Sequence, residues 1–331
     1  MVLDCGIAMF VVPERITKDL VSIEEAIAAI EAALISLEKG TGQLFPVATG
    51  RAIGTENVFS AKSGQVEVNG SAILGVKVGS YWPGNGTIGL PSHGSTVIIL
   101  DERTGEPHAV LGAGYLTALR TAAIDAVAVK YLARADASVV GIVGAGAQAL
   151  TDLRAVSSVR QISRAYVWSR STERVASFLR AAESLAFEVH QDTIEHVVAQ
   201  ADILITATDS RAPLVKREWV RLGTHISAMG ADGSGKQELD VETVSEAVLF
   251  ADVVAQSISI GEFQHAVRAG LVATDSIGTI GAVAAGRTPG RASPRDITIF
   301  DSSGTAIQDL AIAQLALSKA LALNRAISMN W

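Results

Sequence analysis

The stretch VVGIVGAGAQAL, from Val139 to Leu150, decides the fold that this sequence predicts. A short apolar run, typical of a buried strand, leads into Gly144-Ala145-Gly146, and a helix-compatible run follows. The pattern Gly144-x-Gly146-x-x-Ala149 matches the glycine-rich turn that holds the pyrophosphate of a dinucleotide. Gly144 would permit the tight turn, Gly146 would let backbone N–H groups approach the phosphates, and Ala149 would let the helix pack closely on the strand. An ordinary strand–helix turn is the alternative, but the flanking strand and helix that the motif requires are both predicted.

The sequence after this turn alternates between strand and helix patterns. Strands are predicted in RAYVWSR (164–170), ADILITATDS (201–210), HISAMGAD (225–232) and DITIFDSSG (296–304), and a helix in TERVASFLRAAESL (172–185). Alternation of this kind is typical of a parallel sheet with helices on both faces. The sequence therefore predicts an α/β, Rossmann-like, doubly wound domain.

The sequence before the turn has a different texture. A helix is predicted over residues 16–39, with a capping box of Ser22 and Glu25 and a stop at Gly40. Short β-rich runs with turn signals between them fill residues 45–112, and helices are predicted over 117–133 and 305–324. We therefore expect a second, α+β domain. The predicted boundaries are 1–118 with 306–331 for this domain, and 119–305 for the dinucleotide-binding domain.

The composition excludes several classes of protein. The chain has 331 residues, 49% of them hydrophobic, and a net charge of −7, which argues against nucleic-acid binding. The single cysteine, Cys5, excludes a disulfide framework within the chain and a cysteine-rich zinc site. The first residues do not resemble a signal peptide, and no uncharged apolar run reaches the roughly 18 residues of a membrane span. We expect a soluble cytoplasmic protein that binds neither membrane nor nucleic acid.

The end of the second predicted strand bears on the choice of dinucleotide. NAD-binding domains usually place an acidic residue there for the ribose 2′-hydroxyl, whereas a basic residue accommodates the 2′-phosphate of NADP. Here the strand ends in Trp168-Ser169-Arg170-Ser171-Thr172, without a carboxylate. The sequence therefore favours NADP(H). NAD(H) is the alternative, with Arg170 stacking on the adenine.

A few polar residues stand where hydride-transfer chemistry would need them. Lysine and arginine side chains that could bind a substrate carboxylate are candidates for catalytic and substrate-binding residues. These candidates are Arg51, Lys62, Lys77, which interrupts an apolar strand, and Arg120, which could also be a surface residue of its helix. His93 is a further candidate, although a single histidine in a loop is more often solvated than catalytic. Asp232 could simply cap a helix or turn. Asp232 follows the end of a strand, however, which is where ligands of open α/β sheets bind. The remaining histidines show no metal spacing, so we expect no catalytic metal.

Taken together, these motifs resemble the ornithine cyclodeaminase/μ-crystallin family. The residues that carry the resemblance span nearly the whole chain: Lys77 with GSYWPGN (79–85), Gly89-Leu90-Pro91, LTALRTAA (116–123), GAGAQA (144–149), Gly230-Ala231-Asp232, KQELD (236–240) and FDSSG (300–304). The order of LTALRTAA, GAGAQA and FDSSG is highly specific. The resemblance implies a homodimer, an N-terminal domain that contributes substrate contacts and the subunit interface, and a Rossmann domain that binds NAD(P).

The resemblance also implies roles for individual residues. Arg51, Lys77 and Arg120 would contact the substrate carboxylate, and Asp232 would lie beside the reacting carbon. The cofactor would be bound by a larger set: Gly144, Gly146, Ala147, Gln148, Ser169, Arg170, Ser171, Thr206, Thr208, Met229 and Thr305.

Two departures from the family pattern narrow the predicted activity. Lys62-Ser63 replaces the Met-Pro pair usual in cyclodeaminases, and Ser60 replaces their acidic residue, which disfavours ornithine recognition. An added lysine instead suits a second substrate carboxylate, with His93 as a further contact. The segment 253–265, with Tyr81-Trp82-Pro83, resembles that of bacterial iminosuccinate (ketimine) reductases.

The sequence thus predicts an NAD(P)H-dependent oxidoreductase that reduces imines of 2-oxo acids to L-amino acids. Its substrate would be of the iminosuccinate type or a cyclic ketimine such as pyrroline-2-carboxylate. The predicted catalytic residues are Asp232, Lys77 and Lys62. An ornithine or lysine cyclodeaminase and an alanine dehydrogenase are alternative enzymes. A μ-crystallin-like protein that binds NADPH and a ligand without catalysis is the alternative outside enzymes.

Overall fold

The computed structural model describes residues 8–68 and 70–330, and the chain divides into two compact units. The first unit comprises Met1–Arg120 with Thr305–Trp331, and the second comprises Thr121–Gly304. Cys5 lies outside the described residues. The first unit is thus assembled from both ends of the chain, whereas the second is one continuous segment.

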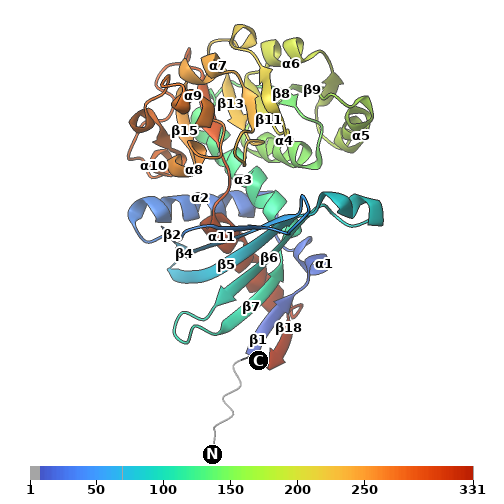
Figure 1. Ribbon diagram of the computed structural model, residues 1–331, viewed down its shortest axis with the longest axis vertical. Coiled ribbons are helices and arrows are strands. Elements are labelled where there is room, and N and C mark those ends of the chain that lie inside the picture. Colours follow the sequence, from blue (N-terminus) through green and yellow to red (C-terminus); the bar gives the residue numbers. More distant parts are fainter. Residues whose placement is uncertain (1–7, 69, 331) are drawn as a thin grey trace, which may run out of the picture. The chain divides into compact units, whose positions relative to one another are not determined.

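The first unit is built on an eight-stranded, mostly antiparallel sheet (Figure 1). Its strands follow the order β18-β1-β7-β6-β5-β4-β2, with β3 also paired to β4. Their bounds are β1 (Ala8–Val12), β2 (Gln43–Leu44), β3 (Ala48–Arg51), β4 (Val58–Val68), β5 (Ser71–Tyr81), β6 (His93–Leu100), β7 (Pro107–Gly112) and β18 (Ile327–Asn330). The long strands β4 to β7 form an antiparallel meander, and their side chains alternate between a covered and an uncovered face.

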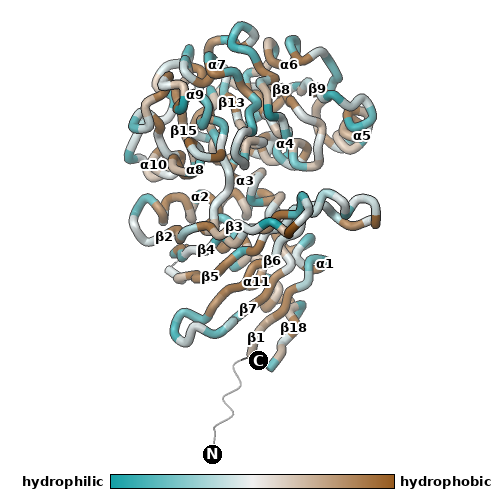
Figure 2. The backbone as a smooth tube through the Cα atoms, viewed as in Figure 1, coloured by the Kyte–Doolittle hydropathy of each residue, from teal (hydrophilic) through white to brown (hydrophobic). Residues whose placement is uncertain are grey.

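Helices α2 (Ile23–Lys39) and α11 (Ala306–Ala322) of this unit lie against one face of the sheet. The unit also contains α1 (Glu14–Thr17), the 3-10 helix η1 (Pro83–Ile88) and the start of α3 (Gly114–Leu132). Helices α2 and α11 pack against β4, and α11 also packs against β5 and β6. Figure 1 draws α11 behind these strands, and Figure 2 shows how hydrophobic the strands and α11 are.

The helix predicted over residues 16–39 is in fact two helices. The Ser22 side chain accepts the Glu25 N–H and the Glu25 side chain accepts the Ser22 N–H, as the capping box predicts. Because a capping residue must leave the helical conformation, Ser22 is extended, with φ −78° and ψ 164°, and α2 begins at Ile23. Gly40 ends α2 at φ 79°, as predicted.

The second unit is a parallel doubly wound sheet, which confirms the predicted fold class. Its eight strands follow the order β10-β9-β8-β11-β13-β17-β15-β16. The strand bounds are β8 (Val139–Val143), β9 (Arg164–Trp168), β10 (Glu188–Gln191), β11 (Ile203–Thr206), β13 (His225–Ala228), β15 (Val248–Ala251), β16 (Gly278–Thr279) and β17 (Thr298–Asp301), with β12 (Arg211–Val215) and β14 (Gln237–Leu239) in a small separate sheet. The connecting helices are α4 (Ala147–Val159), α5 (Thr172–Ala182), α6 (Ile194–Gln200), α7 (Val241–Ser245), α8 (Val254–Ser257), α9 (Gln264–Arg268), α10 (Ile280–Ala284), η2 (Arg217–Trp219) and η3 (Thr274–Ser276).

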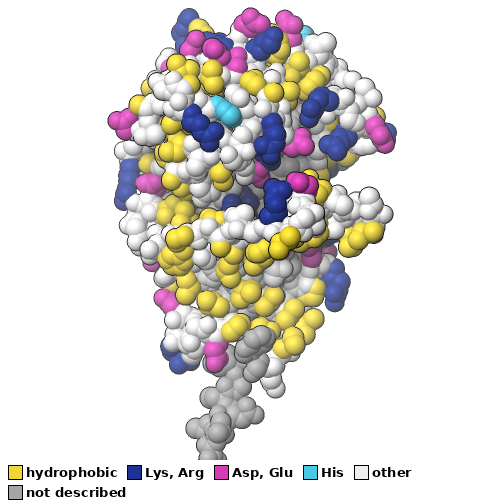
Figure 3. Space-filling view, viewed as in Figure 1, with side chains coloured by type: hydrophobic (Ala, Val, Ile, Leu, Met, Phe, Trp, Pro, Cys, Tyr) yellow, Lys and Arg dark blue, Asp and Glu magenta, His cyan; other side chains and the backbone are white. Residues whose placement is uncertain are grey.

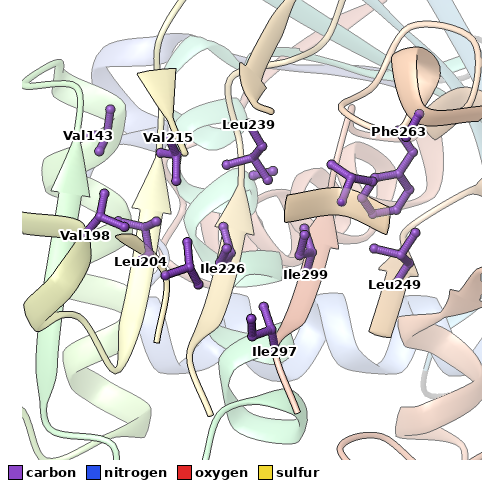
Figure 4. Close-up of a cluster of buried hydrophobic side chains, with 14 of the residues drawn as sticks. Val143, Val198, Leu204, Val215, Ile226, Leu239, Leu249, Phe263, Ile297 and Ile299 are labelled. Carbon is purple, nitrogen blue, oxygen red and sulfur yellow. The ribbon is translucent and has the colours of Figure 1, made fainter. Parts of the chain in front are cut away.

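The core of this unit lies on both faces of the parallel sheet. Along β11, Leu204 belongs to one buried cluster, whereas Ile203 and Ile205 belong to the other. Figure 4 shows the first cluster, in which Leu204 and Ile226 from neighbouring strands pack in the same layer as Phe263. Burial on both faces explains why these strands read as continuous apolar runs in the sequence.

Two kinds of feature are absent from the described residues. No helix among them is long and apolar enough to cross a membrane. No group of three or more His, Cys, Asp and Glu side chains among them is arranged to hold a metal ion.

Candidate functional site

The glycine turn follows β8 at the point where the sheet order reverses. Strands β9 and β11 lie on either side of β8, and ligands of open α/β sheets bind outside the carboxyl ends of strands at such a point. Gly144 has φ 112°, and a Cβ atom there would stand 2.6 Å from the Ala207 carbonyl oxygen. Its N–H donates to the Trp168 carbonyl at 2.8 Å. Only glycine fits this position.

The helix that follows presents an open N-terminus. Gly146 caps α4 without any side-chain hydrogen bond, and a Cβ atom at this position would meet nothing within 4 Å. The first N–H groups of a helix have no partner within the helix and favour an anion. Ala147 and Gln148 form its first turn, with the Gln148 amide donating to buried Asp152 at 2.6 Å. The turn therefore has both the space and the donors for a dinucleotide pyrophosphate.

The end of β9 carries the residues predicted to select the cofactor. Ser171 caps α5 by accepting the Arg174 N–H, and Ser169 Oγ accepts the Ser171 N–H at 3.5 Å. The exposed Arg170 guanidinium lies 3.6 Å from the Asp209 carboxylate, which follows β11. Because β8 lies between β9 and β11, this ion pair passes over the end of β8, where the glycine turn begins.

Glu238 joins the ends of two central strands, a role that the sequence did not reveal. It is fully buried, and its Oε1 accepts both the Thr208 N–H at 2.7 Å and the Thr208 hydroxyl at 2.6 Å. Its Oε2 accepts the Thr206 hydroxyl at 2.7 Å and the Gly230 N–H at 3.0 Å. Thr206 and Thr208 are predicted cofactor residues. Glu238 thus fixes the backbone on either side of this part of the site.

Further buried carboxylates lie behind Glu238. Glu262 accepts the N–H groups of Glu238 and Leu239, and Asp301 accepts the Ser257 hydroxyl. Burial raises the pKa of Glu238, and it raises those of Glu262 and Asp301 well above their usual range. The negative charge of Glu238 further raises the pKa of Glu262. Because Glu238 receives four donors, we assign the charge to Glu238 and the proton to Glu262.

Asp232, the predicted catalytic carboxylate, lies in the loop after β13. Its Oδ1 is 2.5 Å from the Lys236 amine, which also donates to the Gly230 carbonyl at 3.3 Å. The Asp232 side chain is 58% exposed, so it is accessible to a ligand. Met229, another predicted cofactor residue, precedes this loop and is buried. Its N–H donates to the Thr206 carbonyl oxygen at 2.8 Å.

In the first unit, two of the predicted cations meet at a buried carboxylate. The Lys77 amine lies 2.7 Å from Asp309 Oδ2, and Arg120 Nε lies 3.0 Å from Asp309 Oδ1. Arg120 also donates to Gln308 at 3.3 Å. All three charged residues are at least nine-tenths buried. The sequence predicted Lys77 and Arg120, but Asp309 carried no signal in the pattern of its helix.

A glycine on β5 makes this meeting possible. A Cβ atom at Gly75 would lie 2.8 Å from Leu310 Cδ2, and also 2.3 Å from the Ile98 carbonyl oxygen. The missing side chain lets α11 approach the sheet closely, next to Lys77. A side chain at position 75 would therefore meet both the β6 backbone and Leu310, the residue after Asp309.

The other predicted residues of this unit lie at different distances from the cluster. Lys62 is directly opposite Lys77 in the β4–β5 register, so the two side chains leave the same face of the sheet. Arg51 instead pairs with Glu56 at 2.9 Å and is 59% exposed. The centroid of the His93 ring lies 4.7 Å from that of Tyr81. Tyr81 lies four residues along β5 from Lys77. The structure therefore brings Lys62, Lys77 and Arg120 together but not Arg51 or His93. Thr305, the last predicted cofactor residue, is the buried N-cap of α11.

A second polar network in the second unit resembles a catalytic triad but is sealed. The Ser227 hydroxyl donates to Asp125 and lies 3.4 Å from His225, and all three side chains are fully buried. Burial raises the pKa of Asp125 to about 7 and lowers that of His225 to about 3. Without access for a substrate, this network has a structural role.

The doubly wound sheet and its open glycine turn define a dinucleotide-binding protein of the Rossmann type. The chain belongs to the ornithine cyclodeaminase/mu-crystallin family, whose profile matches residues 8–323. The resemblance predicted from the motifs is thereby confirmed.

Three relatives show the range of activities in the family. The iminosuccinate reductase of Paracoccus denitrificans is 41% identical over 94% of this chain and 97% of its own. Its structure with NAD+ matches with a TM-score of 0.91, at 40% identity over 98% of this chain and 100% of that one.

The other two are also solved structures. An archaeal alanine dehydrogenase dimer with bound NAD matches with a TM-score of 0.93, at 35% identity over 98% and 99% of the two chains. The Δ1-pyrroline-2-carboxylate reductase of Thermococcus litoralis, with NADH and L-proline, matches with a TM-score of 0.91, at 33% identity over 98% and 100%. These relatives agree with the predicted class, an NAD(P)-dependent oxidoreductase acting on imines or amino acids.

Proposed function

We propose that this protein is an NAD(P)H-dependent reductase that converts imines of 2-oxo acids into L-amino acids. The observation that carries the proposal is the buried cluster of Lys77, Arg120 and Asp309 on a chain that also has an open dinucleotide turn. Two cations share one carboxylate, and Lys62 adds a third positive charge nearby. The surplus positive charge suits a substrate carboxylate. The substrate would be iminosuccinate or a cyclic ketimine such as pyrroline-2-carboxylate.

The residues of the chain divide the work of this reaction. A nicotinamide dinucleotide, when bound, supplies the hydride. Lys77 and Arg120 would bind the substrate carboxylate and fix its orientation, with Arg51 as a further predicted contact. Lys62 would take a second carboxylate or polar tail, and His93 stays a further predicted contact. Asp232 would stabilise the protonated imine, because a nearby anion favours the charged form.

The end of β9 supports NADPH as the favoured cofactor, with NADH as the alternative. Residues 168–172 present hydroxyls and Arg170 but no carboxylate toward the position of a ribose 2′-group. Arg170 would exchange its exposed contact with Asp209 for the 2′-phosphate. Steady-state KM values for both cofactors test this choice directly. A lower KM for NADH than for NADPH would contradict it.

An imine panel tests the proposed reaction. Iminosuccinate, pyrroline-2-carboxylate and piperideine-2-carboxylate should each be assayed for oxidation of NADPH and NADH. We expect turnover of at least one of them, and no oxidation with any would refute the proposal. Arg120→Ala should abolish affinity for the carboxylate substrate with cofactor binding unchanged. An Asp232→Asn variant with full activity would refute the role of that carboxylate.

Simple measurements separate the alternative functions. An ornithine or lysine cyclodeaminase would release ammonia without a net change in nicotinamide absorbance. An alanine dehydrogenase would turn over pyruvate with ammonia efficiently. A binding protein of the μ-crystallin type would bind NADPH without turnover.

We further propose that a second copy of the chain covers the uncovered face of the first unit's sheet. Leu74 and Val76 of β5 lie opposite Leu100 and Ile98 of β6 on this face, and Val110 of β7 lies beside Ile98. All of these side chains are partly exposed. Figure 3 shows hydrophobic side chains gathered over these strands. Light scattering should give twice the chain mass, and a monomer at micromolar concentration would contradict the proposal.

A further inference from the structure

Asp309 differs from the other charged residues of the first unit in its burial and in its partners. Its side chain is 1% exposed, and each carboxylate oxygen faces a different cation, Lys77 or Arg120. The cations come from β5 and α3, and the carboxylate from the first turn of α11. A carboxylate that is bridged in this way fixes the separation of two side chains that would otherwise repel each other.

Resting on the imine-reductase function, we propose that Asp309 is a positioning residue of the substrate-carboxylate site. It holds Lys77 and Arg120 side by side at the covered face of the sheet, where both can bind a substrate carboxylate. Asp309 itself need not touch the substrate. Its negative charge makes two buried cations tolerable, and it leaves part of their positive charge for a ligand.

The electrostatics of Lys77 give this arrangement a measurable consequence. Desolvation, with the charges of Arg120 and Lys62, lowers the pKa of Lys77, Asp309 raises it, and the balance of these effects is a pKa of about 8. The groups that face Lys77 are Asp309 of α11, Arg120 of α3 and Lys62 of β4, while its partner on β6 is the apolar Val97. Lys77 is therefore charged at neutral pH and loses its proton within the range of ordinary assays. Without Asp309, this loss would occur at lower pH.

The test is the pH dependence of KM in the Asp309→Asn variant. Wild-type KM for the carboxylate substrate should rise above pH 8, as Lys77 loses its charge. In the variant the same rise should begin about one to three pH units lower, the usual effect of removing an adjacent opposite charge. KM at pH 8.5 should increase about tenfold or more over wild type. At pH 6, protonation of Lys77 should recover part of the affinity. The ratio of the variant's KM to the wild-type KM at each pH is independent of the titration of the imine itself, because both proteins receive the same substrate.

Three controls separate positioning from a general structural effect. Glu25→Gln removes the other ion pair of α11, in which Glu25 lies 2.5 Å from Lys319, and should leave the profile at the wild-type position. Lys77→Arg replaces the titrating amine with a group that stays charged, so the rise above pH 8 should disappear. The dissociation constant of NADPH should change less than about twofold in every variant, because the glycine turn belongs to the second unit.

The outcomes are distinct. Superimposable KM profiles for wild type and a folded Asp309→Asn variant would overturn the inference. If this variant does not fold, a wild-type KM that stays constant from pH 6.5 to 9.5, or a rise that persists in Lys77→Arg, would overturn it instead. Absence of turnover by the wild-type protein with every imine would refute the proposed function rather than the role of Asp309.

Discussion

Glu238→Gln is the substitution whose effect can be worked out most fully from the structure. Each Glu238 oxygen accepts one backbone N–H, from Thr208 or from Gly230. A glutamine amide has one oxygen, so whichever way it is turned, its NH2 group faces a backbone N–H. The variant loses a charge-assisted hydrogen bond, about 1.5–3 kcal/mol, and leaves a buried donor without a partner, about 1–3 kcal/mol. We expect the variant to lose about 3 kcal/mol of stability in total. This loss lowers the population of the ordered strand ends, relative to the disordered ones, about 100-fold.

Thermal unfolding and NADPH binding measure this effect together. The melting temperature should fall by several degrees, and the dissociation constant of NADPH should rise at least about tenfold. Glu246→Gln, which removes the exposed partner of Arg217 in the same unit, is the matched control and should cost less than about 1 kcal/mol. If Glu238→Gln matched wild type in both measurements, Glu238 would have to carry a proton, and our assignment of charge would be wrong.

Three further predictions concern the cofactor, the assembly and pH. Arg170→Ser should raise the KM for NADPH about tenfold and that for NADH less than twofold, and equal effects would argue against 2′-phosphate recognition. Val76→Lys should convert a dimer to a monomer in light scattering without loss of helical circular dichroism, and an unchanged mass would refute the assigned face. Burial raises the pKa of Asp125 to about 7, above the roughly 3.9 of an unfolded chain, so the stability that this group contributes declines between about pH 4 and 7. The melting temperature of Asp125→Asn should therefore gain on that of wild type as the pH rises from 5 to 8, and a constant difference would contradict the shift.

Local patterns predicted the parts of the fold that depend on neighbouring residues. The Gly144 turn, the Ser22 capping box and the Gly40 stop each rest on a few adjacent positions, and the structure contains all three. The break before α2 was missed because residues 16–21 keep an apolar pattern that also suits a helix. The Ser22–Glu25 capping box marks the start of α2, but the predicted helix was extended across it to residue 16.

The candidate site was predicted less completely, since its buried acids act over long distances in the chain. Asp309 meets Arg120 across 189 positions, and Glu238 meets Thr206 across 32. No periodicity marks such pairs, and an acid within an apolar helix can equally be a surface residue. The cations were easier to find, because Lys77 interrupts a strand that is otherwise apolar. Arg51 was predicted as one of the cations that could bind a substrate carboxylate, and its role stays a prediction.

The order of the chain sets a sequence of events during synthesis. Strands β1 to β7 and both cations leave the ribosome before the second unit, Thr121–Gly304, whereas α11 and β18 follow only after that unit has been made. Until then the covered face of the sheet has α2 but lacks α11, and Lys77 and Arg120 lack their counter-ion. The continuous second unit can complete its own sheet first, and domains generally fold as units during translation. A truncation before Thr305 would leave a nascent first unit with an open apolar face, a substrate for chaperones and proteases rather than an enzyme.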